Sequence, residues 1–461
     1  MIKKPGILSF RSMLTIAMPL VISKGSETVM LFTDRAFLSF LGQNHISAAM
    51  SGGLSAFVFS SFFAGVISYV NALAAQYHGA KQPEQSMRSA HQGIWLALFS
   101  FPLCLALIPF VHGFFLWAGH TQEQLVLEFS YYRILTFGSL FSFFRASIEG
   151  YFIGTGQTRK VMGSNILGMV INIPLNYILI FGHLGFPAMG IEGAAIGSIL
   201  GNATCSVYLL LAFVKAAKKM RLPVFGPIRS GIFKKLLRYG LPAGGELFFN
   251  VFLFNFFIQM MHSINPTVAV ATTITFNYNM IAFIPLLGLS FAITSMTGQQ
   301  MGASSVEGAK KVAKLAAIVT YGYGLFMVVT FLIGTPLFVK LFLGGVDPKN
   351  STIPELSVTM LRLATIYIMA DGTQLLFSGV LRGAGDTRWV MYISMSLHII
   401  MASGAYIMIK VLKQGPLTVW YFFIAFVFAL GLAMFLRFLS GHWQKIKMID
   451  EASKTMTINP E

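Results

Sequence analysis

A short motif occurs twice in this chain, and its two copies lie far apart. Residues 154–162 read GTGQTRKVM, and residues 378–391 read SGVLRGAGDTRWVM. When the copies are aligned at Gly-x-Thr-Arg, Arg159 matches Arg388, an offset of 229 residues. A motif repeated in this way predicts that the two halves of the chain are copies of one structural unit.

Two further landmarks repeat in the same order, at an offset of 223 residues. Pro19 matches Pro242, and the Gly-Ala pair at 79–80 matches the pair at 302–303. The change in offset requires about six additional residues in the second half, and we expect them in the long loop at 343–355. Repeated halves in a membrane chain are typical of transporters.

The composition predicts a protein that crosses the membrane many times. Hydrophobic residues make up 55% of the chain, charged residues only 11%, and the mean hydropathy is +0.71. About 20 apolar residues span a bilayer as a helix. We predict twelve such helices, at residues 12–40, 46–75, 91–117, 124–154, 161–182, 190–214, 236–263, 268–298, 312–342, 355–384, 389–411 and 417–439.

Each repeat therefore contains six helices, and six is even. The two repeats then enter the membrane from the same side and are related by an axis along the bilayer normal. The predicted fold is an all-α polytopic membrane protein, with twelve transmembrane helices in two pseudo-symmetric six-helix lobes. We expect an N-terminal lobe at 1–220, a cytoplasmic linker at 221–235, and a C-terminal lobe with a short cytoplasmic tail at 236–461.

The net charge of +17 follows from membrane topology. If both termini are cytoplasmic, 24 of the 33 Lys and Arg residues fall in the termini, the cytoplasmic loops or the adjoining helix ends. Residues 215–238 alone carry eight of them. This is the positive-inside bias, and it argues against a nucleic-acid partner. We expect a multi-pass protein of the bacterial inner membrane.

The chain lacks the motifs of the common enzyme classes. Cys104 and Cys205 lie within apolar spans, so no disulfide framework is indicated, and the nine His residues show no metal-ligand spacing. A phosphate-binding loop, a nucleophile elbow and a His-Glu-x-x-His zinc motif are all missing. We therefore expect neither an enzyme nor a protein with a cofactor.

Acidic residues inside the membrane are the main functional candidates. A charge near the bilayer centre costs at least about 2.5–3.5 kcal/mol, so such residues are rare and usually functional. Five of the sixteen Asp and Glu residues fall within predicted spans: Glu27, Asp34, Glu149, Glu246 and Asp371. The alternative for each is a buried ion pair that only fixes packing.

In the first half, Glu27 and Asp34 are seven residues apart and lie on one face of the first helix. Lys24, one turn before Glu27, would neutralise that acid, and we favour the ion-pair interpretation for these two. Asn172 and Asn176 share a face of the fifth helix. Beside a carboxylate they could bind a small cation or a proton, although amide bonds between helices are an equally good explanation.

In the second half, Glu246 and Asn250 are four apart on the seventh helix, and Asp371 and Gln374 lie on the tenth. Both acids are predicted near mid-membrane. We expect Glu246 and Asp371 to meet if the seventh and tenth helices are neighbours.

At this point the chain resembles the multidrug and toxic compound extrusion (MATE) family of transporters along nearly its whole length. The matching segments are TDRAFLSFLG, QYHGAKQPEQS, NIPLNYILIFG and MGIEGAAIGS in the first half, and GLPAGGELFFN, FNYNMIAFIP, QQMGAS and DGTQLLFSGVLRGAGDTR in the second. The resemblance implies two six-helix lobes forming a V around a central cavity. It also implies export of organic, often cationic, compounds coupled to inward flow of H⁺ or Na⁺.

The resemblance assigns roles to residues of the first lobe. Asp34 matches the aspartate used for coupling in many family members, and Asn172 and Asn176 match the pair beside it. The second of these is Asp in some members, so Asn here removes one titratable group. Ser198 falls where a hydroxyl often completes the site. We include Glu27 as a further candidate of this lobe.

In the second lobe, Asp371 matches a family aspartate. The family often has a Glu eight residues after its proline, where this chain has Asn250, and Glu246 stands one turn earlier. Asn277, from the segment FNYNMIAFIP, is the remaining candidate. A bound Na⁺ would sit at Asp34 or between Glu246 and Asp371.

The leading expectation is thus an antiporter that exports amphipathic organic cations in exchange for H⁺ or Na⁺, surrounded by lipid and acting as a monomer. A flippase for lipids or glycolipids, or a metabolite exporter of the same superfamily, is the alternative. A flippase should line its cavity with several basic residues for pyrophosphate, and few basic residues lie in mid-span here: Lys24, Arg133, Arg145 and Arg362. A receptor or scaffold would not need the repeat or the five acids.

Overall fold

The computed structural model describes residues 9–117, 121–343 and 353–449. Within these ranges the chain is almost entirely helical and contains no strand. The first half comprises α1 (Phe10–Ser39), α2 (Gln43–Ser68), α3 (Val70–Gly79), α4 (Pro83–Ala106), α5 (Ile108–Trp117), α6 (Gln122–Gly154), α7 (Thr158–Phe181) and α8 (Gly190–Lys219). The second half comprises α9 (Ser230–His262), α10 (Pro266–Gly302), α11 (Val306–Leu343), α12 (Ile353–Ala384), α13 (Thr387–Tyr406), the π-helix η2 (Ile407–Val411), α14 (Pro416–Leu439) and the 3₁₀-helix η3 (His442–Lys445).

These elements make twelve membrane-crossing units, as predicted. Helices α2 and α3 meet at Tyr69 and form one crossing, α4 and α5 meet at Leu107, and α13 continues into η2. Eleven of the crossings in the described ranges are long and apolar enough to span a bilayer. The twelfth, α6, is long enough at 33 residues but carries five charged side chains. Two of these charges, Arg145 and Glu149, form ion pairs inside the protein, as shown below.

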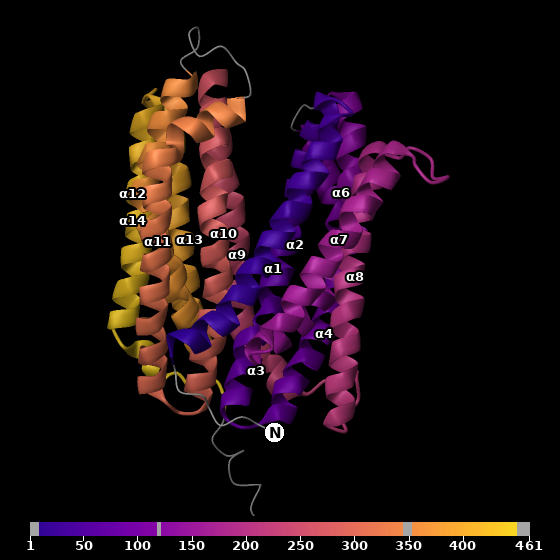
Figure 1. Ribbon diagram of the computed structural model, residues 1–461, viewed down its shortest axis with the longest axis vertical. Helices are drawn as coiled ribbons and strands as arrows, with labels where there is room; N and C mark the ends of the chain where they lie inside the picture. The colour runs from indigo at the N-terminus through magenta and orange to yellow at the C-terminus, as the bar shows by residue number, and fades with distance from the viewer. Residues whose placement is uncertain (1–8, 118–120, 344–352, 450–461) are drawn as a thin grey trace, which may run out of the picture.

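The helices form two lobes (Figure 1), with α1–α8 in one and α9–α14 in the other. The lobes touch at one end and diverge at the other. Helix α2 packs against α9, and α1 and α3 pack against α10. Helix α1 begins and α14 ends at the side where the lobes touch, which we call the terminus face.

The contact between the lobes repeats the internal symmetry of the sequence. Gln76 Nε2 donates to the backbone oxygen of Gly383 at 2.9 Å, and Gln299 Nε2 donates to that of Gly154 at 2.8 Å. The two glutamines are 223 residues apart and the two glycines 229, which are the offsets of the repeat. The duplicated halves thus meet through the same bond, made twice. We call these two bonds the paired seam.

The duplicated Gly-Ala pairs allow this close approach. A Cβ atom on Gly79 would lie 1.9 Å from the backbone oxygen of Gln299, and one on Gly302 would lie 1.9 Å from that of Gln76. Any side chain at either position would push the lobes apart. The sequence landmark at 79–80 and 302–303 is therefore a packing requirement of the seam.

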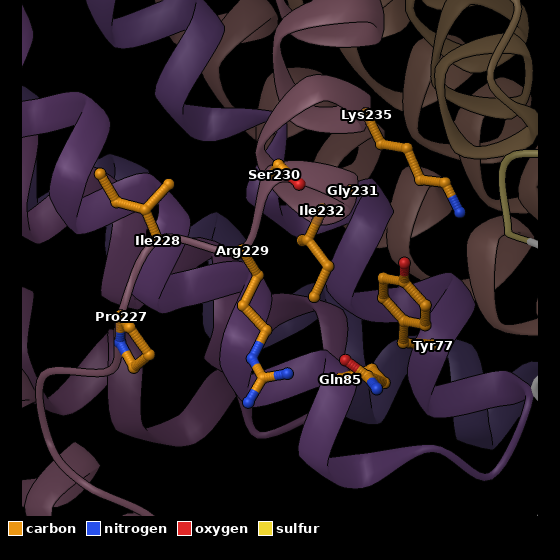
Figure 2. A pocket seen from close by; sticks show the side chains of 9 residues that line it. All are labelled: Tyr77, Gln85, Pro227, Ile228, Arg229, Ser230, Gly231, Ile232 and Lys235. Atoms are coloured by element: carbon orange, nitrogen blue, oxygen red, sulfur yellow. The ribbon is translucent and has the colours of Figure 1, made fainter.

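The connection between the lobes is shorter than expected, because α9 begins at Ser230, inside the predicted linker 221–235. The connection lies on α4, where Trp95 Nε1 donates to the backbone oxygen of Gly226 at 2.9 Å. A pocket of about 520 Å³ lies at this connection. Figure 2 shows the residues that line it: Tyr77, Gln85, Pro227, Ile228, Arg229, Ser230, Gly231, Ile232 and Lys235. Most of the loop expected to hold the additional residues, 343–355, lies outside the described residues.

Candidate functional site

Asp34 lies on α1 and is buried, with 5% of its surface exposed. Ser198 Oγ, from α8, donates to Asp34 Oδ2 at 2.9 Å. Asn176, from α7, donates its side-chain amide to Asp34 Oδ1. Asn172 Oδ1 lies 3.5 Å from Asn176 Nδ2. The structure therefore brings together four of the residues singled out from the sequence, and they come from three helices.

A row of glycines on α8 makes this arrangement possible. Gly193, Gly197 and Gly201 are four residues apart, so they line one face of the helix. A Cβ atom on Gly197 would lie 1.7 Å from Asn176 Oδ1, and one on Gly201 would lie 2.9 Å from Asn172 Cβ. Small residues at this spacing let membrane helices pack closely. They press α8 against the two asparagines and place Ser198 beside Asp34.

The hydrogen-bond donors to Asp34 in the described part of the chain are neutral. Arg35 is next in sequence, but its side chain is exposed. A buried carboxylate without a cationic partner is costly, and binding a proton or a small cation relieves the cost. Two polar atoms beside it, Asn176 Oδ1 and Asn172 Nδ2, are buried without a hydrogen-bond partner. A proton or a small cation bound at this site would therefore relieve the cost of burying the Asp34 carboxylate.

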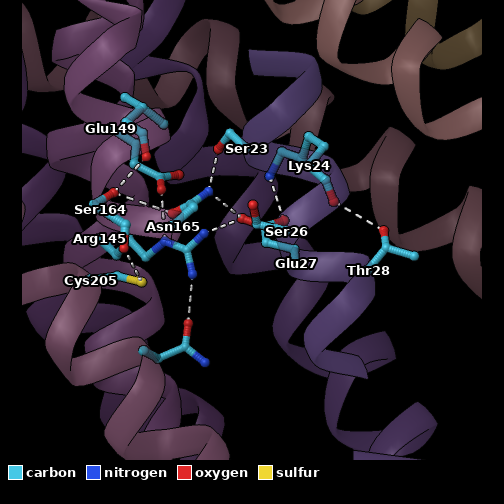
Figure 3. Close-up of polar contacts among 12 residues, drawn as sticks. Ser23, Lys24, Ser26, Glu27, Thr28, Arg145, Glu149, Ser164, Asn165 and Cys205 are labelled. Atoms are coloured by element: carbon cyan, nitrogen blue, oxygen red, sulfur yellow. Dashed lines mark hydrogen bonds and ion pairs between the residues drawn. The ribbon is translucent and has the colours of Figure 1, made fainter. Parts of the chain in front are cut away.

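Glu27 has different surroundings, shown in Figure 3. Lys24 Nζ lies 2.8 Å from Glu27 Oε2, and Arg145, from α6, pairs with the other carboxylate oxygen. Arg145 Nε also lies 2.7 Å from Glu149 Oε1. Two basic and two acidic residues therefore form a balanced cluster. The geometry fits the ion-pair interpretation of Glu27, and no hydrogen bond among the described residues joins it to Asp34.

Two asparagines of this cluster were missed in the sequence analysis. Asn165 donates to Glu27 Oε1 at 3.1 Å, and Arg145 Nη1 donates to Asn202 Oδ1 at 2.8 Å. Asn202 in turn donates to the backbone oxygen of Ser198 at 3.1 Å. The cluster and the Asp34 site are therefore linked through α8. Asn202 could have been found from the sequence, because it follows Ser198 by four residues and therefore lies on the same face of α8.

In the second lobe, Glu246 does not form the expected pair with Asp371. Instead, Arg382 from α12 makes a bidentate ion pair with Glu246. Its Nε donates to Glu246 Oε2 at 3.1 Å, and its Nη2 donates to Glu246 Oε1 at 2.5 Å. Arg382 follows Asp371 by eleven residues, which corresponds to a rise on the order of 16 Å along the helix. Only 1% of the Glu246 surface is exposed. The sequence analysis placed Arg382 in a repeated motif and did not foresee this ion pair.

Asp371 itself is half-buried and has no hydrogen bond or ion pair within the described ranges. One turn earlier, the hydroxyl of Tyr367 is buried and also lacks a hydrogen-bond partner. The structure brings these two unpartnered polar groups to the same part of α12. Of the two acids singled out in the second lobe, Asp371 is thus the one without an ion pair in the described residues.

The other candidates of the second lobe have separate partners. Asn250 Oδ1 accepts a hydrogen bond from Ser394 at 2.7 Å. Asn277 is exposed, and its amide donates to the backbone of its own helix, at Thr273. Gln374 is buried, with 7% exposed. None of the hydrogen bonds in the described residues joins these three to Asp371.

Comparison with known proteins identifies the family. The model of the MatE family matches residues 19–178 and 242–407, one match in each repeat. The chain belongs to the MatE family. Its members are transporters, so the protein is a multi-pass membrane transporter of the MATE type.

Solved structures share the fold at low sequence identity. One, from Pyrococcus furiosus, is described as a MOP superfamily transporter whose binding pocket of reverse polarity suggests a different function. It is 21% identical to this chain and has a TM-score of 0.84, and the match covers 95% of this chain and 97% of that one. Another is described as the outward-facing conformation of a multidrug resistance MATE family transporter, at 22% identity and a TM-score of 0.84 over 95% and 97%. The eukaryotic MATE transporter AtDTX14 is 17% identical, with a TM-score of 0.83 over 94% and 96%.

Proposed function

We propose that the protein is a secondary active antiporter, which exports amphipathic organic cations in exchange for an inward-moving cation bound at Asp34. The observation that carries this proposal is the buried Asp34 carboxylate, whose hydrogen-bond donors in the described residues are neutral. Family membership supports transport, and one structural neighbour is described as a multidrug resistance transporter.

The geometry at Asp34 supports H⁺ more directly than Na⁺. Ser198 and Asn176 both turn hydrogen atoms toward the carboxylate. A Na⁺ ion would instead need oxygen lone pairs directed at it. The free oxygen of Asn176 lies against Gly197 on the far side of the amide. A proton needs only one lone pair of the carboxylate, so it requires less rearrangement of these neighbours than Na⁺ does.

Asp371 supplies a second acid for the same transport cycle. Because it lacks a bonded partner in the described ranges, it is suited to attract the positive charge of a substrate. Competition between substrate and coupling ion at acids in the two lobes would couple their opposite movements. The positive-inside bias orients the terminus face toward the cytoplasm.

Transport by purified protein in proteoliposomes tests the proposal. An inward H⁺ gradient should drive efflux of a fluorescent lipophilic cation such as ethidium, and a Na⁺ gradient at constant pH should not. The same assay is repeated with a fluorescent anionic amphiphile, because a neighbour with this fold is described as having a binding pocket of reverse polarity. Transport of the anion alone, or transport that ignores both gradients, would refute the proposed function.

A further inference from the structure

The paired seam holds the lobes together at the terminus face through two equivalent bonds. Gln76 bonds to Gly383, and Gln299 bonds to Gly154. Because the bonds are copies of one another, they should resist separation of the lobes equally. Any additional contact at one copy would make the seam asymmetric and would favour the closed arrangement at this face.

Residues 441–449, which we call the C-terminal strap, supply such a contact. The chain reverses after α14 at Gly441, where φ is +71°, and forms η3. Trp443 anchors the strap to its own lobe: it is fully buried, and its Nε1 donates to the backbone oxygen of Phe438 at 2.8 Å. The rings of Trp443 and Phe438 are stacked, with centroids 5.4 Å apart.

The far end of the strap reaches the other lobe. Met448 is 2% exposed, and its Sδ accepts hydrogen bonds from Tyr69 Oη at 3.4 Å and from Gln76 Nε2 at 3.1 Å. The backbone oxygen of Arg382 lies 2.9 Å from Tyr69 Oη, so the single hydroxyl hydrogen is shared between this oxygen and the sulfur. Met448 therefore fills the corner between α3 and the end of α12, directly at the Gln76 copy of the seam.

The Gln299 copy has no equivalent contact in the described residues. Gly385 and Gly156 are matched positions of the repeated motif. A Cβ atom on Gly385 would lie 2.7 Å from Met448 Sδ, whereas one on Gly156 would find nothing nearer than Gln299 Nε2 at 3.8 Å. The strap thus occupies one of two symmetry-related places, and the internal symmetry of the transporter is broken there.

We propose that the C-terminal strap is a latch that favours the conformation closed at the terminus face. Met448 is buried, and its two bonds to the first lobe are made, only while the lobes touch there. A contact made in one conformation and lost in the other shifts the equilibrium toward the first. This inference goes beyond the proposed function, because it does not depend on the coupling ion or the transported compound.

Two variants remove the latch, and two matched controls leave it intact. A chain that ends after Ile446 lacks Met448, and Met448→Ala removes only the side chain. A chain that ends after Ile449 keeps the whole strap and controls for truncation. Lys445→Ala changes an exposed strap residue and controls for substitution.

The conformations are measured by distances between spin labels in lipid nanodiscs without substrate. One pair, at the exposed residues Lys219 and Glu307, reports the terminus face, and a second, at Phe40 and Ser263, reports the opposite face. The buried Cys104 and Cys205 are replaced by Ala in all samples.

For both latch variants, we expect the ratio of molecules with a long spin-label distance at the terminus face to those with a short one to be about tenfold higher than in the controls. The reason is that burial of the Met448 side chain stabilises the closed arrangement, which has the short distance. The pair at the opposite face should shorten in parallel. If the truncated chain does not fold, Met448→Ala decides the matter. Distance distributions for Met448→Ala that match those of Lys445→Ala would overturn the proposal, whatever the result of the transport assay.

Discussion

Asp34 and Glu246 are both acids buried within the membrane, yet they have opposite surroundings. Asp34 accepts hydrogen bonds from the neutral side chains of Ser198 and Asn176, whereas Glu246 forms a bidentate ion pair with the Arg382 guanidinium. An acid held by neutral donors can gain or lose a proton with modest rearrangement. An acid paired with arginine fixes the positions of two helices.

A position within a membrane span therefore does not by itself show whether an acid is held in an ion pair. Both acids fall within predicted membrane spans, and both were selected from the sequence for that reason. The charge of the nearest partner separates the two roles, and that partner lies on another helix in each case. Glu27, which is paired with Lys24 and Arg145, belongs with Glu246 in this respect.

The largest expected effect is at Asp34. Asp34→Asn keeps the shape of the side chain and can still accept a hydrogen bond from Ser198, but it cannot exchange a proton. We expect folded, inserted protein with no gradient-driven efflux of a lipophilic cation from proteoliposomes. Efflux close to that of the unmodified protein would remove the distinction between Asp34 and Glu246.

The ion pair of the second lobe should affect stability more than transport. Arg382→Met leaves Glu246 buried without a cation, and we expect the free energy of unfolding to fall by about 3 kcal/mol. This value is at the low end for a buried pair, because a quarter of the Arg382 side chain is exposed. The measurement is the thermal midpoint in detergent. A midpoint equal to that of the unmodified protein would show that the pair does not stabilise the fold.

A double variant sharpens the same comparison. Glu246→Gln combined with Arg382→Met removes both charges, so neither member of the pair is left buried as an unpaired charge. We expect most of the stability to return and gradient-driven efflux to continue, with a strong non-additivity between the single changes. If the stable double variant fails to transport, Glu246 takes part in coupling after all.

A smaller effect is expected at Ser198. Ser198→Ala removes one hydrogen bond to Asp34 and should lower the stability by about 1 kcal/mol while efflux continues. Thermal unfolding and the efflux assay together check this. Complete loss of efflux from a stable variant would mean that the hydroxyl itself is required for coupling.

The smallest effect serves as a control. Asn277 is exposed and bonds to its own helix, so Asn277→Ala should change stability by less than about 0.5 kcal/mol and leave efflux unchanged. A clear loss of efflux in this variant would place Asn277 at the substrate and extend the site of the second lobe.

Local pattern and spacing were sufficient to predict much of this fold. The twelve apolar segments, the even number of helices per repeat and the offsets of 223 and 229 were all visible in the chain. Lipid requires continuous helices, because backbone groups cannot bond to water in the bilayer. The grouping of Asp34 with Asn172, Asn176 and Ser198 came from the resemblance to the family, and the structure places these residues together.

The partners of the charged groups were decided only by the tertiary structure. Glu246 meets Arg382 from a helix more than a hundred residues away, and the strap brings Met448 to Gln76 across the boundary between the lobes. Spacing along one helix shows which residues share a face, but it does not show which face of another helix lies opposite. The packing of the two lobes settles that question, and with it which acids are held in ion pairs and which have only neutral neighbours.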